Sequence, residues 1–130
     1  DEQDMFEHWD VKGLFKGEVL KFDIKGKKKV NRADANSQDE IAWIEGTNVW
    51  GKPGWIKGKA DYIVFERNDY WLVVDRKELY NHVVQKVKEN GVQQGRGIYK
   101  VYQRAGRQDK ITMVPFDNIE KLINIHKVQK

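Results

Sequence analysis

Two aspartates and one lysine near the start of the chain have the types and spacing that metal-assisted phosphodiester hydrolysis requires. Twelve residues separate Asp10 from Asp23, and Lys25 completes an Asp-x-Lys triplet. The two carboxylates would hold Mg²⁺, which polarises a phosphate and lowers the pKa of a bound water. The lysine would position that water or help to deprotonate it, and it would offset charge that develops in the transition state.

These three side chains would converge if two predicted strands pair as a hairpin. Asp10 lies in the first strand, and Asp23 and Lys25 lie in the second. Because side chains alternate across a strand, we expect Asp23 and Lys25 to share one face while Phe22 and Ile24 point into the core. A lone Asp-x-Lys triplet is expected by chance in a chain that is 34% charged, so the prediction depends on the pairing with Asp10.

The elements that must position these residues are mainly strands. Val and Ile outnumber Leu by 24 to 5, and β-branched residues favour strands over helices. We therefore expect an α+β fold around a largely antiparallel or mixed sheet. The expected strands span residues 6–11, 19–25, 41–49, 60–66, 70–75, 97–103 and 110–114, with a turn around 13–17, and the expected helices span 77–90 and a last segment that starts at Asp117.

The composition fits one soluble domain. The chain has 130 residues and no cysteine, which excludes disulfides, thiolate metal sites and a cysteine nucleophile. No stretch approaches 18 apolar residues, so we expect no membrane segment and a cytoplasmic location.

Charge is distributed in blocks, although the net charge is only +4. Residues 1–23 carry seven acids and three bases, whereas residues 25–32 carry five bases and no acid. If the fold places these segments side by side, an acidic pocket with a basic rim results, which suits a divalent cation facing a phosphate backbone. Most lysine runs are solvated loops, which is the alternative interpretation. The expected phosphate contacts are Lys27, Lys28, Lys29, Lys57 and Lys59.

Together these residues resemble the motif of the PD-(D/E)xK nuclease superfamily. Asp10 matches its first carboxylate, and Asp23 and Lys25 match its (D/E)xK element. Trp9 stands where the superfamily motif has proline. The likeness to small phage-encoded members extends in outline over residues 6–80, in runs at residues 43–45, 51–55, 58–65 and 71–79.

The resemblance implies a restriction-endonuclease-like fold, with a central mixed sheet and flanking helices, as a single domain over residues 1–130. It implies an endonuclease that depends on Mg²⁺, with Mn²⁺ as a substitute, and acts in phage DNA processing such as junction resolution or DNA degradation. The location would then be the host cytoplasm, and a homodimer is expected because two sites cut two strands. The family core opens with a helix that carries a glutamate, so Glu2 or Glu7 would fill that role or the helix is truncated. Glu45, beside Trp43 on a predicted strand, is a further supporting residue.

A second placement of the same spacing competes with the first. Asp61, Asp75 and Lys77 also form a D…DxK pattern, and this one leads into a predicted helix. However, Asp75 stands at the strand-to-helix junction, where it could cap the helix while Lys77 faces solvent. We therefore favour the site at Asp10, Asp23 and Lys25.

Two other functions stay open at this point. The modest net charge and the missing opening helix would also suit a non-catalytic nucleic-acid- or protein-binding module on a decayed nuclease fold. Cleavage of RNA instead of DNA is the other alternative.

Overall fold

The computed structural model describes residues 11–15, 17–29, 37–38, 40–47, 53–90, 97–103, 106 and 108–130. Asp10 and Glu7 lie outside the described residues, as does the expected strand at residues 6–10. The backbone of Lys28 and Lys29 is described, but their side chains are not.

Five strands form a mixed sheet in the order β1-β2-β6-β7-β10. Neighbouring strands are antiparallel except for β2 and β6, which are parallel because the chain leaves this sheet after β2 and returns at β6. The expected α+β class with a mixed central sheet is thus confirmed. The strands are β1 (Val11–Phe15), β2 (Glu18–Lys25), β6 (Tyr62–Glu66), β7 (Tyr70–Asp75) and β10 (Ile125–Gln129).

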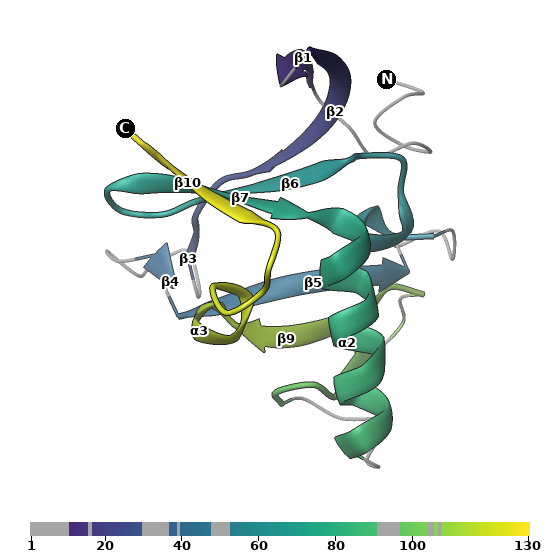
Figure 1. The fold of residues 1–130 in the computed structure, drawn as a ribbon. Coiled ribbons are helices and arrows are strands. Elements are labelled where there is room, and N and C mark those ends of the chain that lie inside the picture. The colour runs from purple at the N-terminus through teal and green to yellow at the C-terminus, as the bar shows by residue number, and fades with distance from the viewer. Residues whose placement is uncertain are drawn as a thin grey trace.

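A second, antiparallel sheet of three strands lies below the first in Figure 1. Its order is β5-β9-β8, and the strands are β5 (Ile41–Thr47), β8 (Val101–Gln103) and β9 (Lys110–Pro115). Between β2 and β6 the chain also forms a short pair, β3 (Lys28–Lys29) with β4 (Ser37–Gln38), and the 3-10 turn η1 (Trp55–Lys57).

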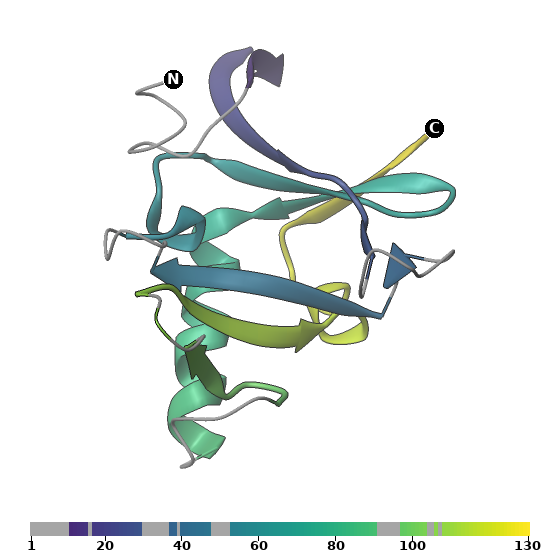
Figure 2. The same ribbon diagram turned by 180° about the vertical axis from the view of Figure 1, so that it is seen from behind.

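One long helix, α2 (Arg76–Asn90), runs alongside both sheets and lies behind β5 and β9 in Figure 2. Asp75 caps it, because its Oδ1 accepts a hydrogen bond from the Glu78 backbone N–H at 2.9 Å. The helix buries Leu79 and Val83 against the core between the two sheets. Within the described part of the chain, no helix is long and apolar enough to cross a membrane.

The hairpin that carries the candidate site differs from its prediction. β1 occupies Val11–Phe15, so the strand runs through residues expected to form the turn. The pairing of Phe15 with Glu18 leaves only a short connection, in which Gly17 adopts a φ of +82°, a left-handed conformation that glycine enters without steric cost.

Two other expected elements are present only in part. The strand expected over 97–103 shortens to β8, since Tyr99 has a φ of +56° and Lys100 closes a turn onto Gly97. The helix expected from Asp117 is only α3 (Phe116–Ile119), and the chain then forms β10 along β7. Ile123, which follows α3, is 87% exposed, and pairing of backbone groups with β7 outweighs the weak apolar periodicity of this segment.

Candidate functional site

Asp23 and Lys25 form an ion pair on the inward face of β2. Asp23 is only 3% exposed, and its Oδ1 lies 3.2 Å from the Lys25 Nζ. The expectation that Phe22 and Ile24 point into the core is wrong, since Ile24 is 43% exposed and Phe22 stacks on Tyr62 at 5.8 Å. The prediction that Asp23 and Lys25 share a face is confirmed, and that face is the buried one.

The pairing of β2 with β6 explains this orientation. Asp23 is in register with Ile63 and Lys25 with Phe65, both of which are buried core residues. Burying a charge is costly unless it is paired, so an inward position on a strand is usually occupied by an apolar side chain. In β2 a carboxylate occupies this position. The position of Asp23 is therefore the first sign of a functional site.

Lys25 is also held by Trp55 of η1. Its Nζ lies 4.7 Å from the centre of the Trp55 ring, a cation–π contact, and Trp55 packs edge-on against Phe65 at 6.2 Å. Trp55 is 6% exposed, so it contacts the Lys25 ammonium from the side of the core.

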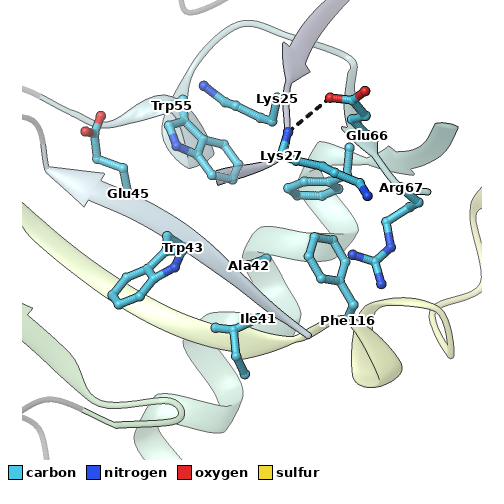
Figure 3. Close-up of a pocket in the computed structure, with 12 residues that line it drawn as sticks. Lys25, Lys27, Ile41, Ala42, Trp43, Glu45, Trp55, Glu66, Arg67 and Phe116 are labelled. Carbon is cyan, nitrogen blue, oxygen red and sulfur yellow. Dashed lines mark hydrogen bonds between the residues drawn. The ribbon is translucent and has the colours of Figure 1, made fainter. Parts of the chain in front are cut away.

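A cavity of about 260 Å³ opens next to this pair, between the ends of β2 and β6 and the strand β5 (Figure 3). Lys25 contributes to its wall, whereas Asp23 does not line it. The other charged side chains around the cavity are Lys27, Glu45, Glu66 and Arg67, of which Lys27 and Glu45 were predicted.

Glu45 lies on the same side of β5 as Trp43, directly before an irregularity in the strand. The register with β9 shifts between Glu45 and Thr47, as a β-bulge does, and bulges re-aim side chains near active sites. Gly54 packs against the Glu45 backbone so closely that a Cβ there would lie 2.2 Å from the Glu45 carbonyl oxygen. The pairing of β5 with β9 and the close approach of Gly54 together fix the backbone position of Glu45.

Glu66, by contrast, is committed to structural contacts. It accepts hydrogen bonds from the Lys130 ammonium at 2.9 Å and from the Lys27 backbone N–H at 3.2 Å. These two hydrogen bonds, the Lys130 one first, hold the pKa of Glu66 below its ordinary value. We therefore assign Glu66 to fixing the strand ends and not to catalysis.

Arg67 was not anticipated from the sequence. Its guanidinium lies over the Phe116 ring at 3.8 Å, and Figure 3 shows the two side chains together on one wall of the cavity. The Arg67 Nε is buried and has no hydrogen-bond partner among the described residues. No sequence signal could have located it, because its partner Phe116 is distant in the chain.

Lys57 and Lys59 lie on a different hollow, of about 560 Å³, together with the residues of the competing placement. There, Asp61 Oδ2 accepts a hydrogen bond from the Lys21 backbone N–H at 2.8 Å, and Asp75 caps α2. Lys77 is exposed, as the capping interpretation expected. The carboxylates of Asp61 and Asp75 thus both accept hydrogen bonds from backbone N–H groups.

The carboxylates that the described residues offer a metal at the favoured site are Asp23 and Glu45. Within these ranges, no group of three or more His, Asp or Glu side chains could hold a metal ion. Mg²⁺ commonly uses one or two protein carboxylates and completes its coordination with waters and substrate phosphates. Of the Asp23 and Glu45 carboxylates only that of Glu45 lines the cavity, so a Mg²⁺ ion there would need waters and a substrate phosphate as further ligands.

Comparison of the chain with protein-family models, curated proteins and solved structures finds no match in any of the three. The function is therefore argued from the geometry of the site.

Proposed function

We propose that the protein is a Mg²⁺-dependent endonuclease that hydrolyses DNA phosphodiester bonds at the cavity beside Asp23 and Lys25. The observation that carries this proposal is the ion pair between the buried Asp23 and Lys25, because Lys25 lines a cavity that Glu45 also lines. A restriction-endonuclease-like fold is part of the proposal, supported by the mixed sheet in which the Asp-x-Lys strand β2 lies between β1 and β6.

The role of each side chain follows from its chemistry. Asp23 and Glu45, with Asp10, would hold Mg²⁺, which when bound polarises the scissile phosphate and acidifies a water. Lys25, held by Asp23 and Trp55, presents a fixed ammonium to the phosphate and to the negative charge that grows in the transition state. Fixing the lysine before the substrate arrives avoids reorganisation during the reaction.

The DNA backbone would be contacted by cations around the cavity and by the neighbouring lysines. Lys27 lines the cavity, whereas Lys57 and Lys59 line the separate hollow and would contact a more distant phosphate. Lys28 and Lys29 follow directly in the chain. Because such contacts release counterions, we expect binding to weaken steeply as salt concentration rises.

Cleavage of three substrates tests the proposal. Supercoiled plasmid, a four-way junction and single-stranded RNA are incubated with Mg²⁺, Mn²⁺ or EDTA, using the wild type and Asp23→Asn, Lys25→Ala and Glu45→Gln. We expect cutting of DNA only with metal, and a fall of about 10²-fold or more in Asp23→Asn and Lys25→Ala. Asp69→Asn, at an exposed turn, is the matched control and should cut like the wild type.

The absence of metal-dependent cutting of every substrate would overturn the proposal, and so would an unchanged rate in Asp23→Asn. If RNA is cut in preference to DNA, the substrate is RNA and not DNA. The expected homodimer is a separate part of the proposal, and light scattering of the purified chain checks it.

A non-catalytic nucleic-acid-binding module is the second candidate. The observation that favours it is that the ion pair neutralises Asp23, so the pair could be a structural remnant of a decayed site. This candidate predicts DNA binding that does not require metal and no cutting under any condition.

A further inference from the structure

The cavity beside Lys25 has a lining of aromatic rings as well as cations. Its rings are Trp43, Trp55, Phe65 and Phe116, and its cations are Lys25, Lys27 and Arg67. Unstacked nucleobases are recognised by stacking on aromatic rings or on arginine guanidinium planes, while cations bind the adjoining phosphates. The lining therefore combines both parts of nucleotide recognition.

The four rings differ in exposure, and this divides their roles. Trp55, Phe65 and Phe116 are 4–7% exposed and pack against one another, so they form the inner wall. Trp43 is half-buried and comes from the same side of β5 as Glu45, at the boundary of the cavity. Since Lys25 already covers the face of Trp55, Trp43 is the ring best placed to stack on a ligand.

Arg67 adds a third cation to the lining. Its guanidinium lies over Phe116, and Figure 3 shows these two side chains across the cavity from Trp43. A nucleotide that stacks its base on Trp43 can therefore extend its phosphate towards Lys25, Lys27 and Arg67.

We infer that this cavity binds a single unpaired nucleotide of a nucleic-acid strand, with its base on Trp43 and its phosphate towards Lys25, Lys27 and Arg67. The inference rests on the proposed function and names its substrate class: nucleic acid that contains an unpaired nucleotide. The volume of about 260 Å³ is slightly below the roughly 300–1,000 Å³ of small-ligand sites, a size that suits one nucleotide better than a larger ligand.

Equilibrium binding in EDTA tests this inference without any need for cleavage. The probes are a labelled single-stranded DNA, its blunt duplex, the same duplex with one unpaired nucleotide, and free deoxynucleoside monophosphates. Anisotropy and tryptophan fluorescence are recorded at one fixed salt concentration. We expect the unpaired nucleotide to raise affinity over the blunt duplex about tenfold, with quenching of tryptophan fluorescence.

Variants locate the effect in the cavity. Trp43→Ala should abolish the tenfold preference, whereas Trp43→Phe should keep most of it because a stacking ring remains. Arg67→Gln should reduce the preference, because one of the cations that face the phosphate is lost. Trp71→Ala is the matched control, because Trp71 lies outside the cavity beside Lys130, and it should keep the preference. Thermal unfolding of each variant shows that it is folded.

Equal affinity for all the DNA forms would overturn the inference, as would an undiminished preference in both Trp43→Ala and Arg67→Gln. Binding of monophosphates alone would also overturn it and assign the cavity to a free nucleotide. Metal-dependent cutting without any preference for unpaired nucleotides would overturn this inference and leave the nuclease proposal standing. A preference for unpaired nucleotides without any cutting would overturn the nuclease proposal and leave this inference standing.

Discussion

The Asp23 carboxylate and the Lys25 ammonium lie 3.2 Å apart on the inward face of β2, where Asp23 is in register with the fully buried Ile63. A buried ion pair is weak evidence of stabilisation, because apolar residues of similar volume often stabilise such a position equally well. The pair therefore has a better explanation in function than in folding.

Replacing both members of this pair should separate stability from activity. Lys25→Met alone should lower the free energy of unfolding by about 2 kcal/mol, because it leaves the buried carboxylate without this counter-charge. The free energy of unfolding of the double variant Asp23→Leu/Lys25→Met should be within about 1 kcal/mol of the wild-type value. This variant should not cut DNA. Urea unfolding and the plasmid assay measure the two quantities.

An exposed pair is the control for that experiment. Lys86 and Glu89 lie 3.6 Å apart on the solvent side of α2, and removing either should change the free energy of unfolding by less than about 0.5 kcal/mol. A double variant of Asp23 and Lys25 that is less stable than Lys25→Met would contradict the functional explanation and make the pair a structural requirement.

Asp75→Ala should weaken the fold and spare the activity. Removing the N-cap of α2 leaves the Glu78 N–H without this acceptor and should cost about 1 kcal/mol in the free energy of unfolding. Asp75→Ser should restore most of that stability, since serine is also a good N-cap. Loss of cutting in a folded Asp75→Ala protein would move the site to Asp61, Asp75 and Lys77.

Gly54→Ala should disturb Glu45 through the backbone. The added Cβ would lie 2.2 Å from the Glu45 carbonyl oxygen and 2.8 Å from its Cγ, so β5 would have to shift. We expect a loss of about 2 kcal/mol in the free energy of unfolding and a lower cutting rate. Gly46→Ala is the control, because its nearest contact would be an ordinary 3.9 Å. If Gly54→Ala and Gly46→Ala have similar free energies of unfolding, the close packing of Gly54 against the Glu45 backbone is contradicted.

Strong local patterns made part of the fold predictable. β7 matches its predicted range of residues 70–75, and α2 begins one residue before its predicted start, because an alternating apolar run and a capping aspartate define these elements locally. β10 was missed because its few apolar residues also fit a short helix, and only pairing with β7 decides between the two.

The site was predictable only where it depends on neighbours in sequence. Asp23 and Lys25 share a face because residues two apart in any strand do so. Which face is buried depends on the pairing of β2 with β6, a contact between distant segments, and the expected orientation was therefore reversed. The Arg67–Phe116 contact is likewise non-local.

His82 of α2 and Tyr99 form a further buried contact, between His82 Nε2 and the Tyr99 hydroxyl at 2.7 Å. Asn118 donates a second hydrogen bond to this hydroxyl at 3.0 Å. Burial first, and then the Lys86 ammonium, lower the pKa of His82 below its ordinary value of 6.5, although Glu78 and Glu89 oppose this. The lowered pKa favours the neutral imidazole, whose unprotonated Nε2 can accept a hydrogen bond from the Tyr99 hydroxyl.

This neutral histidine should make stability depend on pH on the acid side. As pH falls below about 6.5, the unfolded chain binds a proton that folded His82 does not, so the free energy of unfolding decreases until the lowered pKa is reached. His82→Gln, which retains a hydrogen-bonding side chain without the titration, should show a smaller decrease than the wild type. Urea unfolding midpoints measured between pH 8 and pH 5 check this, with His126→Gln, at an exposed position on β10, as the control. The same pH dependence in His82→Gln as in the wild type would show that other groups cause it, because His82 would then bind its proton equally well in the folded and unfolded chains.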